Sequence, residues 1–325
     1  MSNPCDAFPY GFRIAGDTRN DRRLIIWSAA FLAYCECDEK ANIESESYLS
    51  AFCFGDAFCR YIETNRTTKG YTGETYSSWL WFDIDREDDF EQATIDARRL
   101  ACGLGDRYAI DDELLVFFSG SKGFHLGLPT SLWEPLPGLS FSAYCRAFAE
   151  SIASLFKVGI DASVYDRVRA FRAPNSKHPK TGLHKRRVLV DELLHLEPSR
   201  LRSMASEPEP FDLPRTPRAS QQAIADWKAA VDAVDHKQAE IASSRAVGCC
   251  PSSLNRSTLD FIREGSAAGD RARSLFSAAA NLAEFGCSFE LASALLSESA
   301  LDSGLPPSEV RRQIECGIRK GGDNG

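Results

Sequence analysis

Three separated groups of residues in this chain are of the types that bind metal ions and phosphates. The first is Asp83-Ile84-Asp85, the second lies in residues 119–125 (SGSKGFH), and the third begins at Asp161 and continues into a basic stretch. Carboxylate oxygens are good ligands for Mg²⁺, and fixed cations offset the charge of phosphates. Together the groups supply three carboxylates and a set of cations, which are the parts that nucleotidyl transfer requires.

The spacing of Asp83 and Asp85 suits a pair of divalent ions. Alternate residues of a strand point to the same face, so these carboxylates lie about 6.6 Å apart along the chain. Such a pair can hold two ions about 3.5–4 Å apart, an arrangement that activates a 3′-hydroxyl and stabilises a leaving pyrophosphate. Asp-x-Asp also occurs in glycosyltransferases and calcium loops, and an acidic strand end in an exposed loop is the alternative interpretation.

Residues 119–125 have the features of an anion-binding turn. Gly120 and Gly123 let backbone amides turn toward an anion, and Lys122 adds a compact positive charge. His125 begins the outgoing strand, where a ring nitrogen could donate to a phosphate oxygen. The alternative is a tight hairpin with an incidental histidine.

The third group would complete a carboxylate triad through Asp161. Asp166 is the rival for this role, although its neighbour Arg167 favours an ion-paired, structural Asp166. Downstream cations could form a clamp on phosphates, with the guanidinium fork suited to bidentate contact. The members of this predicted clamp are Arg172, His178 and Lys180.

A strongly basic stretch surrounds this clamp. Residues 167–187 include eight Lys or Arg residues and no acidic residue, although the whole chain carries a net charge of −8. Because nucleic acid responds to local potential rather than to net charge, phosphate is the expected partner of this stretch. A solvated basic face is the alternative. The candidates for DNA contact here are Arg167, Arg169, Lys185 and Arg186.

The elements around these groups predict an α+β fold. Residues 77–85 and 114–118 have the pattern of buried strands, residues 124–128 of a short strand, and residues 90–104 and 141–156 of amphipathic helices. Residues 24–36 could start the catalytic unit as a strand or helix, residues 46–62 are compatible with a helix, and residues 158–172 and 187–194 add strands or strand ends. This irregular alternation favours α+β over a doubly wound parallel sheet.

Composition changes near the middle of the chain. Four prolines fall within residues 206–217, so we expect the domain boundary there. The prediction is a catalytic domain over residues 1–205, a proline-rich linker and connector helix over 206–254, and a helical domain of three or four helices over 255–325.

The remaining composition is that of a cytoplasmic globular protein. Of the 325 residues, 43% are hydrophobic and 26% are charged, and no apolar run approaches the roughly 20 residues that span a bilayer. The first residues have neither a basic leader nor an apolar stretch, which argues against secretion.

The eleven cysteines are irregularly spaced. Cys35 and Cys37 could hold zinc with Cys53 and Cys59, but free thiols in a reducing cytosol are the favoured interpretation.

The three groups resemble the motifs of the archaeo-eukaryotic primase superfamily. That family carries an Asp-x-Asp/Glu motif, a Ser-x-His-type motif and a later single Asp, in this order. Here they fall on Asp83 and Asp85, on residues 119–125, and on Asp161. The second segment is similar to the polymerase domains of bacterial ligase D. The third resembles primase-polymerases in its VYDRVRAFR sequence and primase small subunits in its HPKTG sequence.

This resemblance implies a catalytic core with an RRM-like sheet and two Mg²⁺ or Mn²⁺ ions held by Asp83, Asp85 and Asp161. The zinc knuckle of many family primases is not recognisable in the sequence, which puts a zinc requirement in doubt. The resemblance also implies a bound nucleoside triphosphate. Its implied binding residues are Ser119, Lys122, His125, Arg172, His178 and Lys180.

Residues 255–322 resemble, more loosely, the helical C-terminal domain of phage and plasmid primases, with an ordinary helical bundle as the alternative. This resemblance makes Arg271, Arg273 and Arg312 candidates to touch template or initiating nucleotide.

We therefore expect a template-dependent primase-polymerase that acts on single-stranded DNA with NTP or dNTP substrates in a bacterial or phage-infected cell. Primer synthesis for a phage, plasmid or mobile element is favoured over repair gap-filling, and a replicative helicase is a candidate partner. The alternatives are a catalytically silent replication-initiation module and a metal-dependent transferase acting on small molecules.

Overall fold

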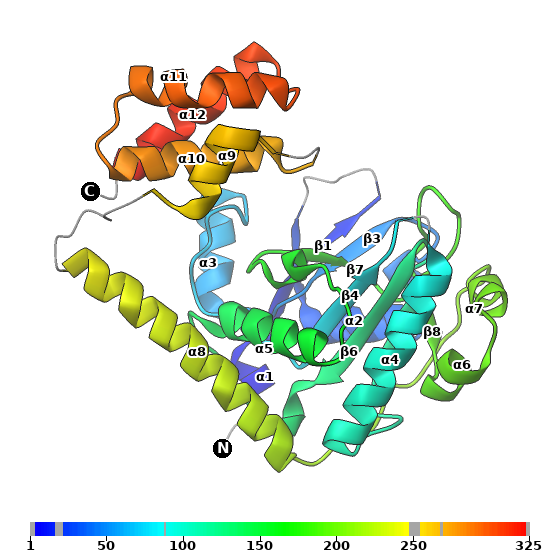
Figure 1. Cartoon of the computed structure of the whole chain (residues 1–325). Helices are drawn as coiled ribbons and strands as arrows, with labels where there is room; N and C mark the ends of the chain where they lie inside the picture. The colour runs from blue at the N-terminus through cyan, green and yellow to red at the C-terminus, as the bar shows by residue number, and fades with distance from the viewer. Residues whose placement is uncertain (1–3, 17–21, 88, 247–253, 267–268, 323–325) are drawn as a thin grey trace. The chain divides into compact units, whose positions relative to one another are not determined.

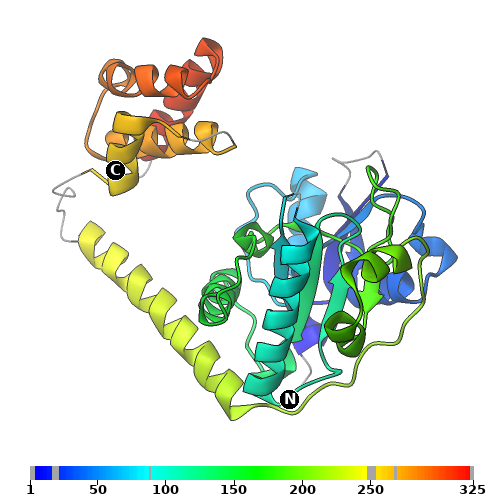
Figure 2. The same ribbon diagram turned by 45° about the vertical axis from the view of Figure 1, so that its right-hand side comes forward.

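The chain folds into two units, visible in a computed structural model (Figures 1 and 2). The structure describes residues 4–16, 22–87, 89–246, 254–266 and 269–322. The first unit covers Met1–Asp235 and the second His236–Gly325. The predicted α+β class is confirmed, with two antiparallel sheets in the described part of the first unit and helices in the second.

The first sheet is built mainly from the N-terminal part of the chain. Its strand order is β2-β1-β3-β7, and all its pairs are antiparallel. Its strands are β1 (Tyr10–Ala15), β2 (Arg23–Ile26), β3 (Ser47–Ser50) and β7 (Ala170–Arg172).

The second sheet carries two of the three predicted motifs. Its order is β4-β6-β5-β8, again antiparallel throughout. Its strands are β4 (Trp79–Asp85), β5 (Leu115–Phe118), β6 (Gly123–Pro129) and β8 (Arg186–Val188). Leu80, Phe82 and Ile84 are buried at alternate positions of β4, and α4 (Phe90–Tyr108) packs on β4 and β6 (Figure 1).

The opposite face of β4, which carries Trp81, packs toward the first sheet. The ring of Trp81 lies 5.4 Å, centroid to centroid, from that of Phe171 on β7, and the ring of His125 on β6 lies 4.2 Å from Phe171. Because Asp83 and Asp85 share the Trp81 face of β4, the acid pair lies where the two sheets face each other.

Helices and short 3₁₀ turns complete the first unit. The helices are α1 (Pro4–Ala7), α2 (Trp27–Cys35), α3 (Asp56–Asn65), α5 (Phe141–Leu155), α6 (Val190–His195), α7 (Pro198–Met204) and α8 (Gln221–Ala246), of which α8 continues past Asp235 into the second unit. The 3₁₀ turns are η1 (Glu39–Ala41), η2 (Thr130–Leu132) and η3 (Ala162–Tyr165).

Three predicted elements differ from the structure. The expected helix over residues 46–62 is strand β3 followed by α3, because β3 is held between β1 and β7, which are distant in sequence. The expected strand over 187–194 is β8 followed by α6. The Glu192 carboxylate accepts a hydrogen bond from the Leu189 amide, which starts that helix. Residues 158–172 hold the turn η3 and only a short strand, β7.

The predicted linker, residues 206–254, does not separate the two units at its prolines. Residues 206–217 are irregular but lie against the first unit, where the Phe211 amide donates to the Cys35 carbonyl and the Phe211 ring lies 5.6 Å from that of Phe117. Helix α8 begins in this unit as well, since Arg107 binds Asp226 through two hydrogen bonds of 2.6 and 2.7 Å. The end of the predicted linker, residues 247–253, lies outside the described residues.

The second unit has its own small core. Buried Leu275, Leu282, Leu296 and Ile314 form it, and the close contact between α10 and α12 depends on small residues: a Cβ at Gly317 would lie 2.6 Å from the Cβ of Ala279. The helices here are α9 (Arg256–Glu264), α10 (Arg271–Glu284), α11 (Phe289–Asp302) and α12 (Pro307–Gly322).

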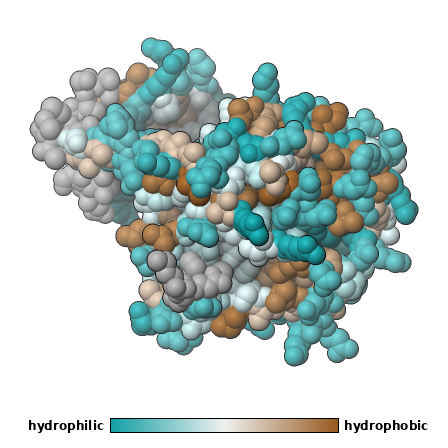
Figure 3. Space-filling model, turned by 90° about the horizontal axis from the view of Figure 1, so that it is seen from below, coloured by the Kyte–Doolittle hydropathy of each residue, from teal (hydrophilic) through white to brown (hydrophobic). Residues whose placement is uncertain are grey.

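The surface mixes polar and apolar side chains, with hydrophobic patches among hydrophilic residues (Figure 3). A cavity of about 800 Å³ in the first unit is lined mainly by apolar residues, including Phe31, Trp79 and Leu136. It lies at the Trp79 end of β4, whereas the acids lie at the Asp85 end. Across the described residues, no helix combines the length and apolar character needed to cross a membrane.

Candidate active site

The acid pair lies at the end of β4, where the neighbouring strand β6 begins with a glycine. In the β4–β6 register, Asp83 is paired with His125 and Asp85 with Gly123. A Cβ at Gly123 would lie 1.8 Å from the Ile84 carbonyl oxygen, so only glycine permits this close pairing. The predicted acid pair and His125 are therefore brought together on one face of the second sheet.

Asp161 is held next to this pair by the backbone. Its amide donates to the carbonyl of Asp83 at 2.8 Å. Its side chain caps η3 by accepting from the amide and the hydroxyl of Ser163, and it lies 3.9 Å from Arg169. Partial burial acts to raise the pKa of Asp161, but the Ser163 hydrogen bonds and Arg169 outweigh it, so the pKa is lowered and Asp161 is ionised at neutral pH.

Asp83 is the most buried of the three acids. Burial, followed by the charges of Asp85 and Asp161, raises its pKa to about 7. Its Oδ1 has no hydrogen-bond partner in the described part of the chain and lies 3.5 Å from Nε2 of His125. Burial, with Lys185 and Arg172 nearby, lowers the pKa of His125 well below its ordinary value, so this imidazole is neutral.

Asp85 is more open to solvent and has a cationic neighbour. Burial raises its pKa, whereas Lys122, whose Nζ lies 3.6 Å from Oδ2 of Asp85, acts in the opposite direction. Lys122, at the tip of the turn between β5 and β6, therefore stands beside the acids, as a phosphate-binding role requires.

The turn of residues 119–123 is fixed on both sides. The Ser119 hydroxyl accepts from the Gly123 amide at 3.3 Å, and Gly120 adopts a φ of +84°, which favours glycine. The Thr181 hydroxyl donates to the Gly120 carbonyl at 2.6 Å. This contact ties the turn to the segment that carries His178 and Lys180.

Arg172 reaches the site from β7. Its guanidinium donates to the Tyr48 hydroxyl at 3.1 Å and to the Lys177 carbonyl at 3.3 Å, and lies 3.8 Å from Glu46. His178 Nδ1 accepts from the amides of Lys180 and Thr181. Burial and the Arg172 charge lower the pKa of His178, so its ring is neutral at pH 7.

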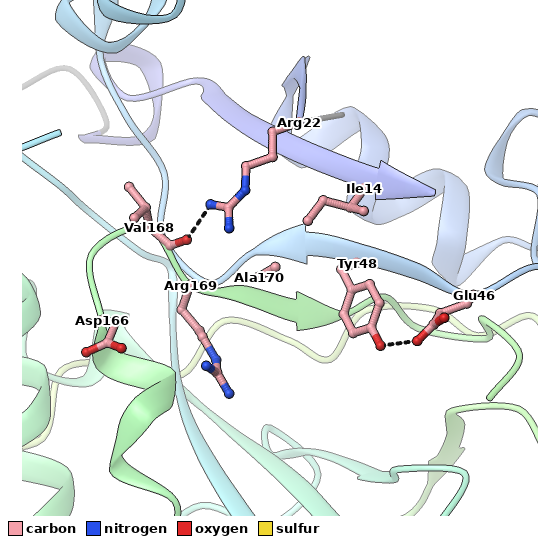
Figure 4. Close-up of a pocket in the computed structure, with 8 residues that line it drawn as sticks. All are labelled: Ile14, Arg22, Glu46, Tyr48, Asp166, Val168, Arg169 and Ala170. Carbon is pink, nitrogen blue, oxygen red and sulfur yellow. Dashed lines mark hydrogen bonds between the residues drawn. The ribbon is translucent and has the colours of Figure 1, made fainter. Parts of the chain in front are cut away.

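A cavity of about 550 Å³ lies over β1, β3 and β7 (Figure 4). Tyr48 lines it with its ring, and its hydroxyl donates to Glu46. Arg22 crosses the strands and donates to the Val168 carbonyl at 2.9 Å. Arg169, which approaches Asp161, also lines this cavity and links it to the carboxylates.

Part of the basic stretch faces inward, contrary to the uniform patch that the sequence predicts. Lys185 is 1% exposed and so does not face a DNA strand. Its Nζ donates to the Arg172 carbonyl at 2.7 Å and lies over the rings of Trp81, Phe117 and Phe171. Burial lowers its pKa well below the ordinary value.

Two further cations of the stretch have structural partners. Arg186 is ion-paired with Glu209, and Arg187, 8% exposed, donates to the carbonyls of Leu114, Val116 and Val188. Arg167 donates to the Leu139 carbonyl. Arg169 and Lys180 keep solvent-exposed side chains and remain the best placed for phosphate contact.

The three arginines of the second unit that were predicted to touch template or initiating nucleotide differ in whether their side chains already have partners in the protein. Arg271 donates to the carbonyls of Ser303 and Gly304, and Arg312 is ion-paired with Glu309 at 2.7 Å. Arg273 is exposed.

The carboxylates fit divalent cations in their chemistry but are not preassembled around one. Oδ1 of Asp83 is a buried oxygen without a partner, and the segments carrying the three acids are hydrogen-bonded neighbours. Among the described residues, no three Asp, Glu, His or Cys side chains gather as a metal site does. Asp85 and Asp161 instead lie near Lys122 and Arg169. The described cysteines are free thiols.

Sequence reasoning missed Arg22, Glu46 and Tyr48, which reach the site from the N-terminal sheet. Tyr48 has no local signal in the sequence, because its strand is defined by pairing with strands that are not its chain neighbours. Arg86, directly after the acid pair, was also missed, because its contacts depend on Asp96 and Gly159.

Comparison with known proteins leaves the family of this chain open. No family model and no curated protein matches the sequence. Among solved structures, the chain is similar to that described as "Crystal structure of primase RepB'", with a TM-score of 0.38 and 13% identity, over 97% of this chain and 92% of that chain.

Proposed function

We propose that this protein is a DNA primase-polymerase that joins nucleotides on a single-stranded template. The observation that carries the proposal is that the segment of Asp161 is hydrogen-bonded to the strand that carries Asp83 and Asp85, with Lys122 and Arg169 next to these acids. Carboxylates hold divalent ions, and cations beside them suit a triphosphate and a nucleic-acid backbone.

The carboxylates would hold two Mg²⁺ or Mn²⁺ ions, which supply activation of a 3′-hydroxyl and stabilisation of the leaving pyrophosphate when bound. The protein's own contribution begins at Asp83, whose burial makes ionisation costly without a cation. Asp161 is held ionised by Ser163 and Arg169, and its carboxylate would act as a further ligand.

The triphosphate would lie across the turn of residues 119–123 and the neighbouring 178–181 segment, which the Thr181–Gly120 hydrogen bond joins. Lys122 and Lys180 would neutralise its terminal phosphates as point charges, and neutral His125 would offer a donor rather than a full charge. The remaining triphosphate contacts of this proposal are Ser119, Arg172 and His178.

The 550 Å³ cavity would receive the nucleoside half of the substrate or the end of the growing strand. It adjoins the acids through Arg169 and offers the Tyr48 ring as a surface for stacking. Priming for a phage, plasmid or mobile element, with a helicase as partner, is the cellular role we propose.

Synthesis without a primer tests the proposal directly. The protein is incubated with single-stranded DNA, Mn²⁺ and labelled nucleotides, with no primer and then with an annealed one. The control is the double variant Asp83→Asn/Asp85→Asn. Products that depend on template and disappear in the variant support the proposal. Extension of the primer alone would indicate gap-filling, and DNA binding without synthesis would indicate a silent replication-initiation module.

A further inference from the structure

Arg86 follows the acid pair in sequence, but its side chain turns away from the carboxylates. One terminal nitrogen donates to the Asp85 carbonyl at 2.8 Å. The other donates to the Gly159 carbonyl at 3.1 Å and to the Asp96 carboxylate at 2.5 Å. A single guanidinium thus joins the end of β4, the segment that precedes Asp161, and helix α4.

The backbone of Arg86 adds a fourth connection. Its amide lies 3.4 Å from the Lys122 carbonyl, at the tip of the turn between β5 and β6. Asp85, Asp161 and Lys122 come from segments far apart in sequence, and all of these segments meet around Arg86. In the described residues, Asp161 is also tied to Asp83 through its backbone amide.

The anchor for this guanidinium is a buried carboxylate. Asp96 is 4% exposed, and its other oxygen accepts from Gln92 at 2.9 Å. A buried ion pair of this type adds little net stability, but its loss leaves an uncompensated charge. Its geometry also requires a planar fork with several donors, which lysine does not provide.

We infer that Arg86 is a positioning residue that sets the separation of Asp85 and Asp161 for metal binding. It touches neither carboxylate of the acid groups and acts by fixing the two backbone segments that carry them. This inference rests on the proposed function, since it assigns these acids to metal. Residues that orient metal ligands from behind typically change metal affinity or activity by about 10–100-fold when replaced.

Arg99 provides a matched control. It lies 3.5 Å from the same Asp96 carboxylate and donates to the Lys157 carbonyl at 3.2 Å. Unlike Arg86, it has no hydrogen bond to Asp85 or Gly159 among the contacts of the described residues. A change at Arg99 therefore perturbs the buried Asp96 and the contact at Lys157, but it leaves the Arg86 hydrogen bonds to Asp85 and Gly159 in place.

The test compares Arg86→Lys with Arg99→Lys in the full chain. Mn²⁺ binding is measured by electron paramagnetic resonance without nucleotide, and synthesis is measured over a range of Mn²⁺ concentrations. We expect Arg86→Lys to weaken Mn²⁺ binding about 10–100-fold and to recover much of its synthesis at high Mn²⁺. Arg99→Lys is expected to behave as wild type in both assays.

Circular dichroism and thermal unfolding show whether Arg86→Lys folds. If it does not, Asp96→Asn replaces it in the test, because this variant removes the charge that anchors Arg86 but keeps the side-chain shape. Wild-type affinity in a folded Arg86→Lys protein, or equal weakening in Arg99→Lys, overturns the inference while leaving the proposed function intact. A wild-type protein that neither binds Mn²⁺ at these acids nor synthesises DNA overturns both.

Discussion

At the scale of single residues, Asp83 contributes a pH-dependent change to the stability of the metal-free protein. Its carboxyl has a pKa of about 7 in the folded chain, against 3.8 ordinarily, because it is buried beside two other acids. The unfolded chain ionises this group near pH 4 and the folded chain near pH 7. The folded state is therefore penalised increasingly between these values, and fully above them.

Asp83→Asn should remove this penalty. At pH 8 and without metal, we expect the variant to raise the free energy of unfolding by roughly 1–4 kcal/mol, since one pKa unit corresponds to about 1.4 kcal/mol. At pH 4 the difference should vanish. Denaturant unfolding in a chelating buffer from pH 4 to 8 measures this difference in the free energy of unfolding. The control is Asp166→Asn, because Asp166 is exposed. A stabilisation that is the same at every pH would contradict this account.

Lys180 and Lys177 lie in the same basic stretch but have different surroundings. Lys177 is ion-paired with Glu44 at 2.9 Å, whereas exposed Lys180 lies on the segment joined to the Gly120 turn. Lys180→Ala should weaken nucleotide binding by about 1.5–3 kcal/mol, the value of a charge-assisted hydrogen bond. Lys177→Ala should not. Nucleotide titration of each variant, with DNA binding measured in parallel, checks this prediction. Equal losses of nucleotide affinity in the two variants would show that Lys180 does not belong to the phosphate clamp.

The residues of the site were only partly predictable. The acids and His125 could be found because strand alternation alone places Asp83 and Asp85 on one face. The burial of Lys185 could not be predicted, because its aromatic surroundings come from three different strands and the sequence shows only its charge.

At the scale of elements, the pairing of β4 with β6 depends on Gly123. A Cβ there would lie 1.8 Å from the Ile84 carbonyl, so Gly123→Ala must push the two strands apart at the acids. We expect a loss of about 1–3 kcal/mol of stability and of most synthesis. The matched control is Gly138→Ala, where a Cβ has nothing within 4 Å. Thermal unfolding and primer extension measure both, and a Gly123→Ala protein as stable and active as the control would refute the role of this contact.

The elements around the motifs were predicted well, and those of the N-terminal sheet were not. The expected strand over residues 77–85 is β4, and the expected helix over 90–104 is α4, because local periodicity defines them. Strand β3 was expected as a helix. Its pairing with β7, over a separation of more than 100 residues, has no local signal in the sequence.

At the scale of the whole molecule, the first unit extends beyond the prolines at which the sequence predicts its end. Trp227 on α8 packs with its ring 5.5 Å from that of Trp133 and 5.8 Å from that of Phe148, and Asp226 also accepts from Tyr108 at 2.9 Å. A chain ending at Glu207 would lose these contacts. We expect it to be unstable or insoluble, whereas a chain ending at Ala246 should unfold cooperatively. Expression and thermal unfolding of both chains distinguish them, and equal stability would place α8 outside the unit.

The chain ending at Ala246 also separates extension from initiation. All three motifs lie within it, so it should extend an annealed primer at a rate close to that of the full chain. Starting a strand requires the protein to hold two nucleotides and a template without a duplex, and Arg273, exposed on the second unit, is the candidate for that grip. We therefore expect unprimed synthesis to fall at least tenfold in the shortened chain, and to fall in the full chain carrying Arg273→Ala. Arg312→Ala serves as the control, because Arg312 is already paired with Glu309. If the shortened chain starts strands as well as the full one, the helical unit has a different task, such as recruiting a helicase.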